Sequence, residues 1–281
     1  MSTQIALVVL LAAALNAAWN ALIKVSGDRI AAMAIVTFMG ALLSSAGLPF
    51  VALPDRAGWP LLALAVALHT GYHFALPIAY EHGDLGQVYP ISRGSAPLLV
   101  TLGAAVFAGE TTGTVQFIGV IFLSAGVVAL AFDRKRGTRH SPRAVLLALL
   151  TGVCIGAYTL VDGLGVRHAG SVMGFALCLT IGDGLLTFLI ALFWKAREMR
   201  AVVNAQWGRS TLAGAMQVGS YWMIIWAMAI APLGAVSALR ETSVLFAALI
   251  STFILKEGFG VWRFVSAGLI VSGISMIRYK P

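Results

Sequence analysis

Residues 112–132 read TGTVQFIGVIFLSAGVVALAF, a stretch without a single charged side chain. Its length matches the roughly 20 apolar residues that a helix needs to cross the hydrocarbon core of a bilayer. Residues 4–23, QIALVVLLAAALNAAWNALI, form a second block of the same kind. In lipid, only helices and closed barrels satisfy all of their own backbone hydrogen bonds. Repeated blocks of this length therefore predict an integral membrane protein built of spanning helices.

The overall composition supports the same class of protein. Hydrophobic residues make up 59% of the 281 positions and charged residues only 11%, against about 25% charged residues in a soluble domain. The formal net charge is +8, but the Lys and Arg residues lie mostly in connecting loops, so nucleic acid is not an expected partner. Cys154 and Cys178 lie inside apolar blocks, where they are expected to be small packing residues.

Breaks at Gly, Pro and charged residues divide the chain into ten expected helices. Their ranges are 4–24, 30–52, 59–81, 86–107, 112–132, 143–162, 170–194, 210–230, 235–255 and 260–278. The basic linker 133–143, DRKRGTRHSPR, falls near the middle. We therefore expect two units of five helices, residues 1–135 and residues 136–281, within one transmembrane domain.

The two units resemble each other in sequence. Four residues of the first unit recur in the same order 147 positions later: Arg93, Glu110, Phe117 and Gly126 are matched by Arg240, Glu257, Phe264 and Gly273. Such an offset indicates duplication. Because five is odd, the copies must enter the membrane from opposite sides. The predicted fold is an all-α membrane protein whose ten helices form two inverted five-helix repeats around a central cavity, and that cavity is the expected substrate site.

The distribution of Lys and Arg predicts the orientation. With ten helices, thirteen Lys and Arg residues fall on one side of the membrane and four on the other, namely Arg56, Arg167, Arg278 and Lys280. The positive-inside rule places the richer side in the cytoplasm, so both termini are expected outside it.

Polar residues within the apolar blocks are candidates for the cavity wall. A charged group at mid-membrane costs about 2.5–3.5 kcal/mol on insertion scales, so it should face a partner or water. In the third helix, one stripe contains His69, Tyr72, His73, Leu76 and Tyr80. The stripe predicts a cavity wall with imidazoles able to take part in proton coupling, while the alternative is hydrogen bonding between packed helices.

Three further helices have polar stripes. The first helix has Asn16, Trp19 and Asn20; the sixth has Thr151, Tyr158 and Asp162; the eighth has Gln217, Ser220 and Tyr221. Amides and phenols at these positions are suited to hydrogen-bond a polar substrate, and packing between helices is again the alternative. The small-residue rows Gly152 and Gly156, and Ala63, Ala67 and Gly71, are expected to permit close helix packing.

The ionic residues complete the candidate site. Tyr89 and Arg93 lie one turn apart in the fourth helix, and Arg240 is adjacent to Glu241 in the ninth. The planar guanidinium of either arginine suits a carboxylate ligand, although Arg240 also has Glu241 as a neighbouring partner. Asp183, in the seventh helix, is expected to pair with Arg93 or Arg240 or to carry a coupling proton. Glu110 and Glu257 follow their helices in turns that contain glycine and are interpreted as structural.

The chain resembles the EamA-type members of the drug/metabolite transporter superfamily, and among them the YddG-like amino-acid exporters. The resemblance rests on residues 16–20 (NAAWN) followed by Lys24, on residues 97–110 (PLLVTLGAAVFAGE), and on their echo at 243–257 (SVLFAALISTFILKE). It implies ten helices in two inverted repeats, with a cavity lined mainly by the first, third, fourth, sixth, eighth and ninth helices. It also implies peripheral fifth and tenth helices, a bacterial inner membrane as location, and a small-molecule substrate.

Together these features predict a secondary transporter that exports amino acids or related small polar metabolites by alternating access. Another cargo, such as a drug or nucleotide sugar, and a non-transporting assembly subunit are the alternatives. The absence of HExxH, GxSxG and clustered acids argues against an enzyme, and no cofactor or metal is expected. The expected substrate-binding residues are Trp19, Asn20, His73, Tyr89, Arg93, Tyr158, Gln217 and Tyr221. The expected charge-pair or coupling residues are His69, Asp183, Arg240 and Glu241.

Overall fold

The computed structural model describes residues 1–24, 28–82, 85–132, 142–253 and 261–279, and the regular elements within these ranges are all helices. The first part contains α1 (Thr3–Lys24), α2 (Arg29–Gly47), α3 (Trp59–Glu81), α4 (Leu85–Phe107) and α5 (Thr114–Ala129), with short 3₁₀ helices η1 (Leu48–Phe50) and η2 (Leu130–Phe132). The second part contains α6 (Pro142–His168), α7 (Val172–Ile230), α8 (Leu233–Arg240), α9 (Ser243–Phe253) and α10 (Val261–Arg278).

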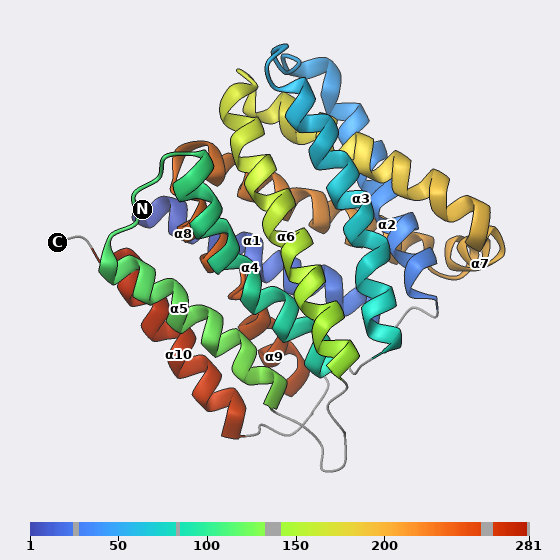
Figure 1. Cartoon of the computed structure of the whole chain (residues 1–281). Helices are drawn as coiled ribbons and strands as arrows, with labels where there is room; N and C mark the ends of the chain where they lie inside the picture. Colours follow the sequence, from blue (N-terminus) through green and yellow to red (C-terminus); the bar gives the residue numbers. More distant parts are fainter. Residues whose placement is uncertain (25–27, 83–84, 133–141, 254–260, 280–281) are drawn as a thin grey trace.

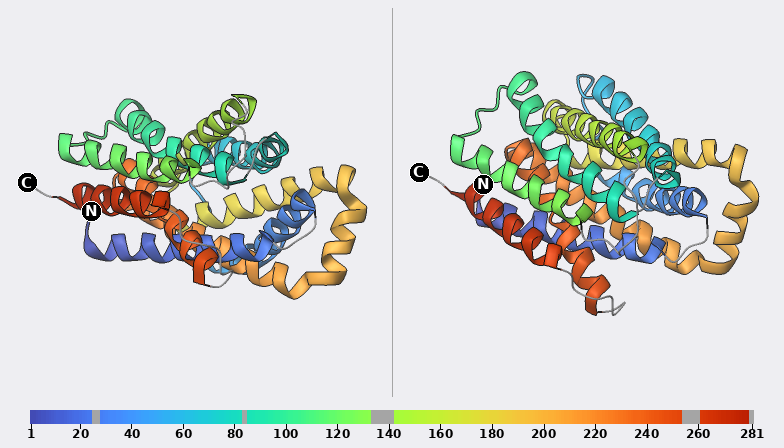
Figure 2. Two further views of the ribbon diagram at one scale, coloured as in Figure 1. Left: turned by 90° about the horizontal axis from the view of Figure 1, so that it is seen from below. Right: turned by 60° about the horizontal axis from the view of Figure 1, so that its bottom comes forward.

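The expected seventh and eighth helices are the two arms of α7. The backbone of α7 leaves the helical region at Lys195 (φ −131°, ψ 22°) and at Gln206 (φ −146°, ψ 25°). Figure 2 shows the result as a U, with a short helical segment joining two long arms. The N-terminus and the end of α10 lie at one end of the molecule, and the bend of α7 lies at the opposite end.

The expected ninth helix is in two pieces, because the chain turns at Glu241 and Thr242 between α8 and α9. Within the described ranges, eight helices are long and apolar enough to cross a membrane, with the double-length α7 counted once. The number of ten spanning helices therefore stays a prediction. The linker residues 133–141, Glu257 and the side chain of Tyr80 lie outside what the structure describes.

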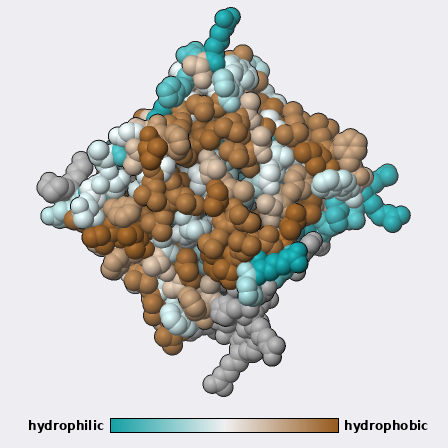
Figure 3. Space-filling model, viewed as in Figure 1, coloured by the Kyte–Doolittle hydropathy of each residue, from teal (hydrophilic) through white to brown (hydrophobic). Residues whose placement is uncertain are grey.

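The outer surface of the bundle is apolar. Figure 3 shows hydrophobic atoms over most of one face, with hydrophilic atoms gathered toward its corners. The exposed apolar side chains include Leu146, Leu150 and Val153 of α6. Exposed apolar surface on this scale marks a surface made for lipid or for a partner. Together with the long apolar helices, it makes the chain a multi-pass membrane protein.

Small residues set the close contacts between helices. A Cβ atom on Gly152 would lie 3.0 Å from the Ser92 carbonyl oxygen, and one on Gly156 would lie 2.9 Å from the Leu99 Cβ atom, so this pair packs α6 directly on α4, as predicted. The row Ala63, Ala67 and Gly71 is exposed on α3 instead, and a Cβ atom on Gly71 would meet nothing within 4 Å. The prediction that this row packs another helix is therefore wrong for this structure, because the row faces outward.

The helices α5 and α10 run side by side at one edge of the molecule (Figure 1). Their backbones approach closely at Gly119 and Gly273, where a Cβ atom on Gly273 would lie 2.6 Å from the Gly119 carbonyl oxygen. The hydroxyl of Ser266 donates to the Gly126 carbonyl oxygen at the same interface. This pair lies away from the polar centre, which the other helices enclose.

Candidate functional site

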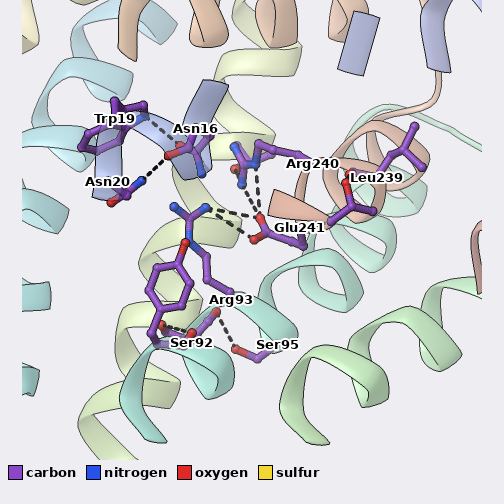
Figure 4. Close-up of polar contacts among 12 residues, drawn as sticks. Asn16, Trp19, Asn20, Ser92, Arg93, Ser95, Leu239, Arg240 and Glu241 are labelled. Atoms are coloured by element: carbon purple, nitrogen blue, oxygen red, sulfur yellow. Dashed lines mark hydrogen bonds and ion pairs between the residues drawn. The ribbon is translucent and has the colours of Figure 1, made fainter. Parts of the chain in front are cut away.

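Two arginines share one glutamate at the centre of the molecule (Figure 4). Arg93 comes from α4, Arg240 is the last residue of α8, and Glu241 follows it in the turn before α9. Arg240 donates from Nη2 and Nε to Glu241 Oε1 at 3.1 and 3.2 Å. Arg93 Nη1 lies 3.4 and 3.5 Å from the two Glu241 oxygens. Arg93 is thus the more loosely held of the two guanidinium groups.

The turn at the end of α8 explains how Glu241 reaches both arginines. The amides of Glu241 and Thr242 donate to the carbonyls of Ala238 and Leu239, three residues earlier in each case. Such bonds tighten a helix end, and the Thr242 hydroxyl also donates to the Leu239 carbonyl. The break turns the fully buried Glu241 side chain toward Arg93 of α4. The cationic Arg240 at the C-terminus of α8 also has a favourable position relative to the helix dipole.

Of the three stripe residues of α1, two line the cavity and the third bonds to its own helix. Asn16 Oδ1 accepts a hydrogen bond from Trp19 Nε1 at 3.1 Å, and both side chains line the central cavity. Asn20 Nδ2 instead donates to the Asn16 carbonyl at 2.7 Å, and Asn20 is not among the lining residues. The Asn16 Nδ2 atom is buried and has no partner in the described part of the chain. The cavity therefore has a free amide donor from Asn16, which lies on the predicted stripe but is not among the predicted substrate-binding residues.

The histidine stripe of α3 meets acidic side chains of α6 and α7. His69 Nε2 lies 2.9 Å from Asp162 Oδ2 and 3.1 Å from the Tyr221 hydroxyl, and that hydroxyl donates to the same Asp162 oxygen. Asp162 is fully buried. Asp162 lies on the predicted stripe of α6 but is not among the predicted site residues; its depth in an apolar helix is the sequence signal that points to it.

His73 and Asp183 form a second histidine–acid pair, between α3 and the first arm of α7. His73 Nδ1 lies 3.3 Å from Asp183 Oδ1. Thr70 and Thr187 donate to the same oxygen at 3.3 and 3.2 Å. The expected pairing of Asp183 with Arg93 or Arg240 is therefore not what the structure has, because α7 packs Asp183 against α3 rather than against α4 or α8.

Tyr158 connects the arginine pair with the histidines. Its ring lies 4.1 Å from the His69 ring and 5.5 Å from the Tyr72 ring, centroid to centroid. The Arg240 guanidinium lies 5.9 Å from the Tyr158 ring centroid, and the Arg93 guanidinium lies 5.4 Å from that of Tyr89. Both distances are within the range of a cation–π contact.

These groups line a cavity of about 80 Å³. Nine of the expected site residues line it: Trp19, His69, His73, Arg93, Tyr158, Asp183, Gln217, Tyr221 and Arg240. Glu241 lies behind the arginines, and Asn20 and Tyr89 lie beside the cavity without lining it. The predicted wall is extended, because α2 contributes Met33 and Thr37, and the first arm of α7 contributes Leu179, Thr180 and Asp183. Neither α5 nor α10 contributes to the lining, as the resemblance implied.

A separate ion pair fixes one end of the bundle. Arg167 Nη2 lies 2.7 Å from Glu110 Oε1, and Arg167 also donates to the carbonyls of Met228 and Ala231. The Glu110 carboxylate accepts from the Leu233 amide at the start of α8, at 2.9 and 3.1 Å. Glu110 therefore has the structural role that its turn predicted. No group of three potential metal ligands occurs among the residues that the structure describes.

A polar cavity inside a multi-pass helical membrane protein is typical of transporters. Residues 142–279, the second half of the chain, match the model of the EamA-like transporter family. This match confirms the resemblance to EamA-type members of the drug/metabolite transporter superfamily, and it indicates a membrane transporter of that type. A solved structure titled "Crystal structure of protein" is similar in fold, with a TM-score of 0.78 and 18% sequence identity, over 98% of this chain and 96% of that one. None of the curated proteins matches the chain.

Proposed function

We propose that this chain is a secondary transporter that exports amino acids or related small polar metabolites across a bacterial inner membrane. In this proposal, residues 1–135 and 136–281 are inverted repeats of five helices, with both termini outside the cytoplasm. Rocking of one repeat against the other would open the cavity to each side in turn.

The observation that carries the proposal is the buried charged wall of the central cavity. Ionised groups at the depth of an apolar bundle are costly unless they pair or face a wet, functional space. Arg93, Arg240, Asp162, Asp183 and Glu241 are all at most 9% exposed, and four of them line or adjoin one cavity together with polar and aromatic side chains. A protein whose only role was assembly with partners would not require buried charged residues around a cavity.

The cavity has the two poles that a zwitterion requires. At one pole, Arg93 makes only contacts of 3.4–3.5 Å to Glu241, and Asn16 Nδ2 has no partner among the described residues. Both are hydrogen-bond donors, and a guanidinium matches a carboxylate. At the other pole, Asp183 lines the cavity and is suited to attract an ammonium group. The rings of Trp19, Tyr158 and Tyr221 would contact varied side chains of the cargo.

The repeat proposal has support from the centre and from the edge of the bundle. Arg93 and Arg240, which are 147 positions apart, meet on a single carboxylate. Gly126 and Gly273, also 147 positions apart, both lie in the contact between α5 and α10. Residues that correspond in sequence thus have comparable surroundings.

The size of the cavity bears on the transport cycle. At about 80 Å³, it is well below the roughly 300–1,000 Å³ of pockets that hold drug-sized ligands. We therefore interpret this conformation as one in which the cavity is narrow, so that a larger cargo enters only after the walls separate.

A flux screen with the purified protein tests the proposal. Proteoliposomes loaded with one unlabelled amino acid are placed in the same labelled amino acid, and counterflow is measured for each of the twenty proteinogenic amino acids. The proposal predicts counterflow above that of protein-free liposomes for a subset of them. If all twenty give the protein-free value, the amino-acid assignment is wrong, and repeating the assay with nucleotide sugars and cationic drugs tests the other cargo classes.

A further inference from the structure

We propose that His69, Asp162 and Tyr221 form a proton-binding site that couples cargo export to proton entry. This inference rests on the proposed function, and it adds the coupling ion and its location to it. It is carried by the charges around the cavity and by the contacts of the three side chains.

The central cluster has an excess of acidic groups. Two guanidinium groups, of Arg93 and Arg240, accompany three carboxylates, of Glu241, Asp162 and Asp183. With both imidazoles neutral, the cluster therefore carries one net negative charge. Because Arg93 and Arg240 both contact Glu241, the unmatched negative charge lies on the side of Asp162 and Asp183. One bound proton stabilises that side of the empty cavity, and the ammonium group of a bound cargo supplies the positive charge there instead.

The contacts of His69 identify where that proton binds. Nε2 of His69 faces Asp162 Oδ2 at 2.9 Å, and a carboxylate oxygen accepts, so Nε2 carries a hydrogen and donates. The Tyr221 hydroxyl donates to the same oxygen. Both hydrogen bonds of His69 in the described chain are made near Nε2, which leaves Nδ1 as the atom that takes up a second proton. The resulting imidazolium pairs with the Asp162 carboxylate.

The surroundings of the Asp162 carboxylate favour a cation beside it. Its side chain is fully buried, and its second oxygen, Oδ1, has no hydrogen-bond partner within the described residues. An anion with one unsatisfied oxygen gains more from a full positive charge on its neighbour than from a neutral donor. A merely structural histidine would need no such acid.

The other charged and titratable groups around His69 favour exchange of the proton for the cargo. They are His73 and Tyr72 on α3, Tyr158 on α6, Asp183 on α7, Arg93 on α4 and Arg240 on α8. Arg93 and Arg240 attract the cargo carboxylate, so its ammonium group must lie toward Asp183, on the side of the cavity that His69 and His73 line. An imidazolium at His69 repels that ammonium group. Entry of the cargo therefore releases the proton from Nδ1 of His69, and one proton leaves for each zwitterion that binds.

The test uses proteoliposomes and a radiolabelled mixture of the twenty proteinogenic amino acids. Vesicles one pH unit more acidic inside than outside, with the membrane potential clamped at zero, should accumulate the mixture up to about tenfold, because one-for-one exchange converts the proton ratio into a cargo ratio. The same vesicles without a pH gradient serve to measure counterflow.

Two variants locate the coupling. Asp162→Asn and His69→Gln should each lose the accumulation driven by the pH gradient while retaining counterflow within about threefold. His168→Gln changes an exposed histidine in the same chemical way and should retain both activities. If one of these two variants elutes as an aggregate in size-exclusion chromatography, the other variant alone tests the proton site.

The outcomes separate this inference from the proposed function. Counterflow by the unaltered protein without any response to the pH gradient overturns the proton site and leaves the transporter standing. Accumulation that survives in Asp162→Asn or His69→Gln overturns the proton site as well. Absence of both activities in the unaltered protein contradicts the proposed amino-acid export itself.

Discussion

At the scale of single residues, Arg93 is the side chain on which cargo binding depends most directly. Its guanidinium is buried, and its contacts to Glu241 are long. Glu241 keeps its shorter bonds to Arg240 when Arg93 is removed. Loss of the Arg93 side chain therefore does not leave an unpaired buried carboxylate, and the protein should still fold.

Arg93→Ala should reduce counterflow of transported amino acids about 10- to 100-fold, because a charge-assisted hydrogen bond is worth about 1.5–3 kcal/mol. Arg93→Lys should restore only part of the flux, since an ammonium group lacks the planar fork. Arg200→Ala, which removes an exposed arginine, is the matched control. Normal flux in a folded Arg93→Ala variant would show that Arg93 does not hold the cargo.

The sequence predicted the residue types at the site better than their partners. The stripe on α3 correctly placed His69 and His73 on the cavity side. Asn16 and Asn20 differ by only about 40° around the helix, so periodicity had no means to choose between them. The partner of Asp183 depends on how α7 is rotated against α3, and no local pattern encodes that rotation.

At the scale of elements, the sequence predicted helices within all the expected ranges but not their interruptions. The break at Glu241 and Thr242 involves neither Gly nor Pro, so hydropathy alone indicated one continuous helix. The bend of α7 at Lys195 and Gln206 lies where the chain carries charge, and there the expected helix ends were correct.

The contact between α5 and α10 gives a prediction about stability. Gly273→Val should destabilise the protein by about 1–3 kcal/mol, because the new side chain would overlap the backbone of Gly119 and Leu123. Gly268→Val on the same helix is the control, since a Cβ atom at Gly268 meets nothing within 4 Å. Thermal unfolding in detergent should show a lower midpoint for Gly273→Val only; equal midpoints would contradict the close contact.

The start of α2 gives a prediction about pH. Burial alone would raise the pKa of Asp28, but the Ala31 amide and the Lys195 ammonium, 2.8 Å away, hold that pKa below its ordinary value of 3.8. A lowered pKa in the folded protein means that Asp28 stabilises the fold above pH 3.8 and that this stabilisation is lost as the pH falls below it.

Asp28→Asn measures this contribution, because asparagine is itself a good N-cap and preserves the start of the helix. The thermal midpoint of the unaltered protein should exceed that of Asp28→Asn at pH 6, and the difference should shrink as the pH is lowered through 3.8 toward 3. A difference that stays constant over this range would mean that the charge of Asp28 plays no part.

At the scale of the whole molecule, a lipid-facing exterior surrounds a charged interior. The exterior was predictable from composition, since apolar blocks of spanning length indicate transmembrane helices whose outer surface faces lipid. The interior cavity was predicted as a class of site, but its volume and the contribution of α2 and α7 depend on how all the helices pack. The ion pair of Glu110 and Arg167 joins the turn after α4 to α6, and the Glu110 carboxylate also joins it to the start of α8 through the Leu233 amide.

The most direct measurement of the central claim is whether the cavity can be reached from both sides of the membrane. In a protein whose Cys154 and Cys178 are replaced by alanine, Ser220→Cys places a nearly isosteric thiol on the cavity wall. Ser124→Cys is the control, because Ser124 is buried on α5 away from the cavity. In oriented vesicles, a membrane-impermeant thiol reagent should label the Ser220→Cys variant from either side and leave the Ser124→Cys variant unlabelled. Failure to label the Ser220→Cys variant from one of the two sides would contradict alternating access.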